Sequence, residues 1–280
     1  MSRVTGQDEL DVLALREHLV APNGPYAALD VVASTGSTNA DLLAAAGQGA
    51  ADRTVLIADA QTAGRGRRDR SWVSPPGSGL YLSVLLRPAA VPAPRLGTLG
   101  MVAGLALMHV AKEAGVTASL KWPNDLLIEG AKCAGVLSEA TPDGAAQAAV
   151  VGVGLNVGAL PADVPAGPGG LPATSFAEHG ATTTHRGLLA LTFLRAFVEL
   201  EQTWRLADGD VQRSGVLTGY REACGTVGQR VRAELPDGGT RTGVAVEIDS
   251  GGQLLIKLDD GVVSSISAGD VVHMKTEDHV

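Results

Sequence analysis

Positive charge is concentrated in one short segment of this sequence, between residues 64 and 70. Arginines are interleaved there with small glycines, as Gly64, Arg65, Gly66, Arg67, Arg68 and Arg70. Glycines let backbone N–H groups approach a phosphate, while guanidinium groups bind its oxygens in a bidentate manner. The segment therefore predicts an anion-binding loop, although a solvated basic turn would show the same run of charge.

A second group of polar residues is the pentapeptide Lys121-Trp122-Pro123-Asn124-Asp125, followed along the chain by Lys132. Pro123 favours an extended conformation for the residue before it and ends the strand, so the amide and the carboxylate are expected at a strand end, where side chains commonly reach a ligand. Burying such charges is costly unless they are paired or used in binding. The tryptophan by itself is more simply explained as a core residue.

Two further motifs are weaker on their own. Ser37-Thr38-Asn39 precedes a helical pattern, and Thr38 with Asp41 fits a capping box, which is compatible with a ligand also binding at the helix start. Gly152 to Asn156 follows an apolar strand and indicates either close approach of backbone to a ligand or a glycine-tolerant turn. Neither a P-loop nor a complete dinucleotide-binding fingerprint occurs in the sequence.

Short β-branched runs alternate with Ala- and Leu-rich stretches in the first three quarters of the chain. Strands are predicted at 29–33, 54–58, 80–86, 118–122, 134–140 and 148–157, and helices at 8–20, 38–47, 96–115, 186–205 and 211–223. Residues 125–140 should fold back as a hairpin around Glu129-Gly130, and the Pro- and Gly-rich residues 158–181 should form a long surface loop. The mixture predicts an α/β or α+β core.

The pattern changes near Gly225. From Val227 onward, short alternating strands are separated by turn residues every 8 to 12 positions, which is typical of a small all-β module of about 50 residues. A length of 280 residues also favours roughly two domains.

Composition narrows the classes of function. The net charge of −8 disfavours sequence-independent binding of nucleic acid through a wide basic surface. Two cysteines, Cys133 and Cys224, are too few for a disulfide framework or a Cys-rich zinc site, and no signal peptide or membrane-spanning run is expected. We therefore expect a cytoplasmic protein without a dedicated metal site.

Taken together, four separated motifs resemble those of the biotin protein ligase family. They are Ser37-Thr38-Asn39; Gln61 to Arg68 with Trp72 and Ser74-Pro75; Lys121 to Asp125 with Lys132 to Gly135; and Gly152 to Asn156. The resemblance runs from about Leu29 to His273. It implies a mixed α/β (α+β) catalytic domain related to class II tRNA synthetases at 29–225, preceded by a lead-in at 1–28 and followed by a small SH3-like β-barrel at 226–275.

Members of that family activate biotin with MgATP to biotinyl-5′-AMP, release pyrophosphate, and transfer biotin to a lysine of a biotin carboxyl carrier protein. The resemblance implies biotin contacts from Ser37, Thr38, Asn39, Gln61, Arg65, Gly66, Arg67, Lys132, Gly135 and Gly152. It implies ATP contacts from Gly64, Arg65, Arg67, Arg68, Trp72, Asn124, Asp125, Lys132 and Asn156. Gly154 would also line the pocket.

The chemistry gives these residues roles. A biotin carboxylate must attack the α-phosphorus of ATP although both are anionic, so the site must neutralise charge and align the groups. Arg65 and Arg67 are expected to bind the carboxylate and phosphate, Lys132 to stabilise the developing charge, and Lys121 to assist. Ser37, Thr38 and Gln61 are expected to form hydrogen bonds with the ureido ring of biotin. A site built in this way rejects acids that lack the ring, because its buried polar groups would be left unpaired. Trp72 should pack on adenine, Asn124 should recognise the nucleotide, and Asp125 should hold magnesium or orient the acceptor lysine.

Two positions depart from the family pattern. Asp69 stands where many relatives have glycine, which lowers the loop's charge and backbone freedom. Cys133 replaces a common leucine; a buried thiol is the simplest expectation, while a pKa lowered by Lys132 would make it sensitive to oxidation. The Arg-rich loop is expected to order over the ligand.

The motifs are also compatible with two other functions. A lipoate or octanoate ligase would share the fold and the adenylate chemistry, and a noncatalytic biotin-binding or scaffold protein would use the β-barrel as an interaction module. About 29 residues precede the first motif, too few for a winged helix, so a monofunctional ligase without repressor activity is expected. We expect a monomer or a weak, ligand-dependent dimer.

Overall fold

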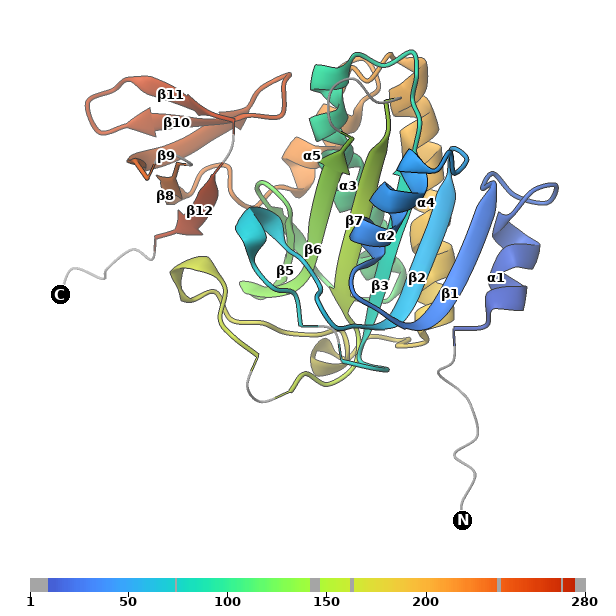
Figure 1. Cartoon of the computed structure of the whole chain (residues 1–280). Helices are drawn as coiled ribbons and strands as arrows, with labels where there is room; N and C mark the ends of the chain where they lie inside the picture. The colour runs from blue at the N-terminus through green and yellow to red at the C-terminus, as the bar shows by residue number, and fades with distance from the viewer. Residues whose placement is uncertain are drawn as a thin grey trace.

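The computed structural model describes residues 10–73, 75–141, 147–161, 164–235, 238–267 and 269–274. Two β-sheets organise the chain, and Figure 1 shows them side by side, with the larger sheet formed first along the sequence.

The larger sheet has seven strands in the order β1-β2-β3-β7-β6-β5-β4. Their bounds are β1 Ala28–Thr35, β2 Thr54–Gln61, β3 Gly79–Leu86, β4 Ser119–Lys121, β5 Asp125–Ile128, β6 Ala131–Ala140 and β7 Ala149–Asn156. Strands β1 and β2 are parallel and the other pairs are antiparallel. All eight residues of β3 are buried, because apolar groups cover both faces at the centre of the sheet.

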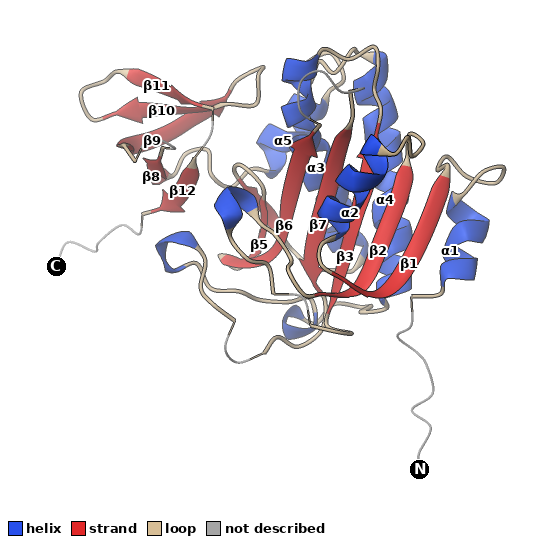
Figure 2. Cartoon of the chain, viewed as in Figure 1, coloured by secondary structure: helices blue, strands red, loops and turns tan. Residues whose placement is uncertain are grey.

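Helices cover the two faces of this sheet unequally (Figure 2). One face carries α1 (Val12–Leu19), α3 (Leu99–Glu113), α4 (Arg186–Leu206) and α5 (Val216–Ala223), whose apolar side chains join one continuous core. The other face carries α2 (Thr38–Gly47), which packs Leu42 and Ala46 on Leu85 and Val150. Since α2 covers only part of that face, the portion over β6 and β7 is left to loops.

The second sheet has five antiparallel strands in the order β11-β10-β9-β8-β12. They are β8 Arg230–Glu234, β9 Thr240–Ile248, β10 Leu254–Leu258, β11 Val263–Ile266 and β12 Asp270–His273. Alternate residues such as Val231 and Ala233 are buried, as period-2 patterning requires. This module contacts the larger one through Trp122, whose indole Nε1 donates to Gly252 O at 2.9 Å, so Trp122 is a core residue as expected.

Most predicted elements are confirmed, including the six strands and the hairpin of β5 and β6. Its turn places Glu129 at φ +49° and Gly130 at φ +80°. Residues 158–181 form a loop with two short 3₁₀ turns, Pro168–Gly170 and Ala177–His179, apart from residues 162 and 163, which lie outside the described ranges.

Three local predictions are wrong in detail. The capping residue of α2 is Ser37, not Thr38, because the Thr38 N–H instead donates to Gln61 Oε1 at 2.9 Å and Asp41 accepts from Thr35. The helix predicted at 96–115 is divided into a 3₁₀ turn, Ala93–Thr98, and α3. The last helix starts at Val216 rather than at residue 211, because Gly215, with φ +79°, separates it from the single turn that Asp210 caps.

One segment among the described residues, Ala93–Glu113, is long and apolar enough to span a membrane. It contains α3, which packs against α4 and the large sheet and buries Leu99, Val102 and Val110. Its apolarity is therefore accounted for by the core of the fold.

Candidate active site

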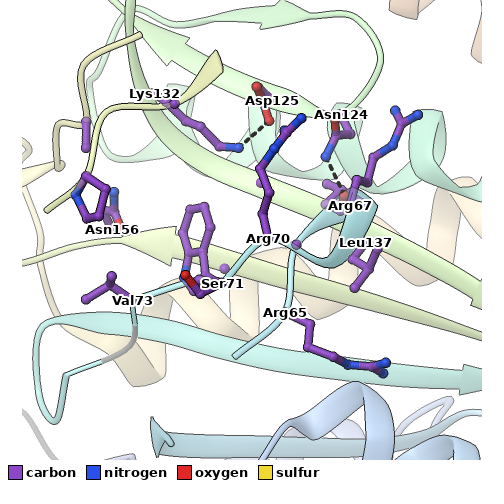
Figure 3. A pocket seen from close by; sticks show the side chains of 18 of the residues that line it. Arg65, Arg67, Arg70, Ser71, Val73, Asn124, Asp125, Lys132, Leu137 and Asn156 are labelled. Carbon is purple, nitrogen blue, oxygen red and sulfur yellow. Dashed lines mark hydrogen bonds and ion pairs between the residues drawn. The ribbon is translucent and has the colours of Figure 1, made fainter. Parts of the chain in front are cut away.

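A cavity of about 490 Å³ lies on the face of the large sheet that α2 leaves uncovered. Its walls come from the start of α2, the end of β2, the loop after β2, the β4–β5 turn, β6, β7, the loop at 160–173 and the start of β12. The volume is in the range of small-molecule sites. Figure 3 shows side chains from the loop and from β5 to β7 converging on it.

Glycines on two neighbouring strands form the floor of the cavity. Gly135 of β6 and Gly154 of β7 are directly paired, and Gly152 lies two residues before Gly154. A Cβ atom at Gly154 would lie 2.5 Å from the Trp72 indole, and one at Gly135 would lie 3.2 Å from it. The absence of side chains thus lets Trp72 rest on the strands, and these glycines allow close approach rather than forming a turn.

The end of the cavity nearest α2 is uncharged and densely hydrogen-bonded. Gln61 Oε1 accepts from the Thr38 backbone N–H and lies 3.2 Å from the Thr38 hydroxyl. The hydroxyl of Ser83, a fully buried residue on β3, lies 2.7 Å from the Thr38 hydroxyl and 2.6 Å from Asn39 Oδ1. The group is suited to a neutral ligand with both donors and acceptors. We call this group, with Ser37, the polar end.

The opposite end of the cavity is cationic. Lys132 Nζ lies 2.6 Å from Asp125 Oδ1 (Figure 3). Lys121 Nζ lies 3.8 Å from Asp125 Oδ2. Lys132 also lies over the Trp72 ring, 5.3 Å from its centroid. Arg67 and Arg70 extend toward the same region. Two lysines and two arginines against two carboxylates, Asp125 and Asp270, leave an excess of positive charge, which suits a phosphate-bearing ligand. We call this group the cationic end.

Burial perturbs two of these cations. It lowers the pKa of Lys121, and the attraction of Asp125 only partly offsets this effect. Burial also lowers the pKa of Arg67, with repulsion from Arg70 and Arg68 adding to it. Burial thus disfavours the charged forms of both side chains, and an anionic ligand in the cavity would stabilise those charged forms.

The Arg-rich loop, residues 64–73, is anchored to the C-terminal module. Arg68 Nη1 lies 2.8 Å from Asp270 Oδ2, Arg70 pairs with the same oxygen, and Arg67 donates to Gly269 O at 3.5 Å. Burial acts to raise the pKa of Asp270, but hydrogen bonds and attraction from Arg70 and Arg68 outweigh it and hold the pKa below its ordinary value. The small module therefore forms part of the cavity wall, where Asp270 and Val271 line it.

The structure brings together nearly all residues that the sequence predicted for the site. Those lining the cavity are Ser37, Thr38, Asn39, Gln61, Arg65, Gly66, Arg67, Trp72, Lys121, Asn124, Asp125, Lys132, Gly135, Gly152, Gly154 and Asn156. Gly64 and Arg68 do not line it: the Gly64 carbonyl accepts from the Trp72 N–H, and Arg68 faces the C-terminal module.

Amide side chains in the cavity wall are bound to backbone. Asn124 Nδ2 donates to Val136 O at 2.8 Å, and Asn156 Nδ2 donates to Thr174 O at 2.9 Å. These bonds fix both side chains beside the glycine floor.

Several residues that line the cavity or lie directly behind its lining were not predicted. Ser83 is the one polar side chain in the apolar run 79–86 apart from Tyr81, a signal that could have identified it. Glu139, Asp270 and the loop at 160–173 gave no comparable signal, because only the fold brings them to the motifs.

Cys133 is fully buried, and burial raises the pKa of its thiol. The expected buried thiol is therefore confirmed, and the alternative of an oxidation-sensitive thiol is not: Cys133 follows Lys132 on β6 and its side chain lies in the core, so the lysine does not activate it. The side chain of Asp69 lies outside the described part of the structure.

Within the described ranges, no group of three or more His, Cys, Asp or Glu side chains could hold a metal ion. A magnesium ion that arrives with ATP is bound mainly by the phosphates and needs only one or two protein carboxylates. Asp125 and Asp270 are the carboxylates that line the cavity at its cationic end.

Comparison with known proteins assigns the family. Residues 31–156 match the model of the biotin/lipoate A/B protein ligase family, and residues 226–274 match the biotin protein ligase C-terminal domain. The chain is 41% identical over 271 residues to the biotin--[acetyl-CoA-carboxylase] ligase of Mycobacterium tuberculosis, covering 95% of this chain and 96% of the relative. The chain belongs to the biotin protein ligase family.

Two other relatives agree with this assignment. The bifunctional ligase/repressor BirA of Bacillus subtilis is 32% identical over 241 residues, which are 85% of this chain and 71% of that protein. The structure of the biotin protein ligase from Aquifex aeolicus in complex with biotin and ATP superposes with a TM-score of 0.70 at 26% identity, covering 90% of this chain and all of that one.

Proposed function

We propose that this protein activates biotin with MgATP to biotinyl-5′-AMP and pyrophosphate, and then transfers biotin to one lysine of the biotin carboxyl carrier domain of acetyl-CoA carboxylase. The observation that carries the proposal is the two-ended cavity. A neutral polar end and a cationic end are joined by Trp72 on a glycine floor, within a chain of this family.

The first step requires two anions to meet. The biotin ring occupies the polar end at Ser37, Thr38 and Gln61, so its carboxylate points along the glycine floor toward Lys132. Arg67 and Lys132 neutralise the carboxylate and the α-phosphate, and Lys132 stabilises the charge that develops between them. Such fixed donors need no reorganisation during the reaction, which is the main source of their effect.

The nucleotide is held by the remaining wall. Trp72 supplies an apolar surface for adenine, Asn124 and Asn156 supply amide groups, and Asp125 orients Lys132 and Lys121. Magnesium, when bound with ATP, supplies further neutralisation of the phosphates. In the second step the acceptor lysine attacks the mixed anhydride and AMP leaves, and Asp125 is also placed to orient that amine.

The finer architecture and setting belong to the same proposal. The catalytic domain spans residues 29–225 and is related to class II tRNA synthetases, and the module at 226–275 is an SH3-like β-barrel. The protein acts in the cytoplasm, as a monomer or weak ligand-dependent dimer, and binds no nucleic acid. The net charge of −8 supports the last point.

The family description also includes lipoate ligases, so lipoate is the second candidate substrate. We would measure pyrophosphate release from MgATP with biotin, lipoate, octanoate or no acid, followed by intact-mass analysis of an added carrier domain. Release with biotin alone and a carrier heavier by one biotin is expected. Release with lipoate instead would replace the substrate, whereas the absence of release with any of the acids would indicate a noncatalytic binding protein.

A further inference from the structure

Glu139, near the end of β6, connects two of the sequence motifs at the polar end of the cavity. Its Oε2 atom accepts a hydrogen bond from Asn39 Nδ2 at 2.8 Å and one from Arg65 Nη2 at 3.0 Å. Asn39 lies at the start of α2 and Arg65 in the Arg-rich loop, so a single carboxylate joins a helix, a strand and a loop. None of the motifs includes this glutamate.

The bonds around Asn39 use its hydrogen-bonding groups within the protein. Its Nδ2 donates to both Leu137 O at 3.1 Å and Glu139 Oε2, and its Oδ1 accepts from the Ser83 hydroxyl. Gly152 approaches so closely that a Cβ atom there would overlap Asn39 Oδ1. Asn39 is 4% exposed, and its side chain therefore holds the neighbouring Thr38 and Ser83 in place rather than binding the substrate directly.

The same carboxylate determines where Arg65 lies. Figure 3 shows the Arg65 guanidinium directed away from Lys132 and Asp125, although Arg65 and Arg67 are two residues apart. The pair with Glu139 thus holds Arg65 beside the polar end, where the two charges balance each other, and leaves the cationic end to Arg67, Arg70 and the lysines.

We propose that Glu139 is a positioning residue for biotin recognition: it aligns Asn39 and Arg65 so that the polar end matches the biotin ring. The inference rests on the proposed function. A carboxylate is suited to this role because it only accepts hydrogen bonds, and both of its neighbours donate. Both neighbours donate to the same oxygen, Oε2, so a glutamine could keep these hydrogen bonds through its amide oxygen but would lose the charge that pairs with Arg65.

The simpler view is that Glu139 and Arg65 form an ordinary surface ion pair. Their side chains are 25% and 41% exposed, and pairs of that kind contribute little to stability. The two views differ in what substitution changes: a surface pair leaves ligand recognition unaltered, whereas a positioning residue changes KM for biotin without a matching loss of kcat.

The experiment uses the full chain with Glu139→Ala, Glu139→Gln and the control Asp259→Asn. Asp259 forms an exposed pair with Arg230 on the C-terminal module, 2.9 Å apart, and so matches the type of interaction without facing the cavity. Glu139→Ala is expected to raise KM for biotin about tenfold, with kcat within about threefold and KM for ATP unchanged. Glu139→Gln, which keeps one acceptor oxygen, should give a smaller rise, and Asp259→Asn should match the wild type.

Two additional measurements sharpen the result. With octanoate added as a competitor of biotin, the inhibition constant of octanoate should be the same in Glu139→Ala and the wild type, because octanoate makes no use of the polar end. In a double-mutant cycle, Arg65→Met should add little to Glu139→Ala, since the two side chains act as a unit.

A KM for biotin within twofold of the wild type in Glu139→Ala would overturn the proposal. It would also be overturned if KM for biotin and KM for ATP rose, and kcat fell, by the same factor. The Kd for biotin, measured by calorimetric titration without ATP, distinguishes failure of the Glu139 proposal from failure of the proposed ligase function. A wild-type chain that binds biotin but releases no pyrophosphate overturns the ligase activity alone, whereas an unchanged Kd in Glu139→Ala overturns the role of Glu139 alone. A wild-type chain that does not bind biotin overturns both.

Discussion

Replacing Lys132 by methionine, which has a similar length and no charge, tests the cationic end most directly. Lys132 Nζ and Lys121 Nζ lie 2.6 and 3.8 Å from the carboxylate of Asp125. At an effective dielectric constant of about 20, the gross attractions are roughly 6 and roughly 4 kcal/mol, most of which desolvation offsets. Asp125 therefore keeps a substantial partner when Lys132 is removed.

The variant should consequently fold. We expect its unfolding free energy to fall by less than the roughly 3 to 5 kcal/mol that accompanies a fully orphaned buried charge. The catalytic effect should be larger, because Lys132 is 22% exposed toward the cavity and is the cation closest to the reacting groups in the proposed mechanism. Loss of one preorganised donor to a developing charge lowers kcat by about 100- to 1000-fold.

The assay is single-turnover formation of the adenylate, monitored by pyrophosphate release at saturating biotin and ATP, together with thermal unfolding. Lys112→Met is the control, because Lys112 is exposed in the last turn of α3, on the face of the sheet away from the cavity. Lys121→Met should cost a smaller, roughly tenfold loss, since Lys121 acts through Asp125. A rate for folded Lys132→Met within threefold of the wild type would refute the assignment.

Three other predictions concern the walls of the cavity. Asp270→Asn should lower the unfolding free energy at pH 7 by about 1 to 2 kcal/mol and make the Arg-rich loop more sensitive to protease. Because the pKa of Asp270 is lowered in the folded protein, its stabilisation is fully present above the ordinary value of 3.8 and is lost as pH falls from there through the lower folded-state pKa. The difference in unfolding free energy between the two proteins, measured by urea titration, should therefore shrink steadily below pH 3.8, and a difference that does not shrink would contradict the pairing. Gly154→Ala should leave the melting temperature within a few degrees but displace Trp72 and raise KM for ATP at least fivefold, and unchanged kinetics would show that close approach at this glycine is unimportant. Cys133 should react with a thiol reagent only after unfolding, as judged by mass spectrometry, and fast labelling of the native protein would contradict its burial.

Local patterns in the sequence were sufficient for most elements. Alternation of apolar residues predicted the strands, and turn residues such as Glu129-Gly130 located the hairpin, because these preferences act over a few neighbouring residues. The capping residue of α2 was not predicted correctly, because it depends on a contact between residues far apart in the sequence. Gln61, at the end of β2, accepts from the Thr38 N–H, and no local rule anticipates a partner 23 residues away.

For the candidate site, the sequence predicted which residues come together but not the direction of every side chain. Motif residues such as Lys121, Asp125 and Lys132 do converge, because the hairpin brings the two lysines to one carboxylate. The direction of Arg65 was not predictable, since it depends on Glu139, which is 74 residues away. Arg68 belongs to the same basic run but lies against the C-terminal module instead of the cavity.

By itself, the sequence determined which residues carry chemistry, the order of strands and helices along the chain, and the existence of a separate β-module, since these follow from residue type and short-range periodicity. Only the tertiary structure decided which face of the sheet is left open, which cations face the cavity, and that the β-module supplies one wall through Asp270. The physical reason is that burial and the pairing of charges depend on neighbours brought together by folding, whereas helix and strand preferences depend on neighbours along the chain.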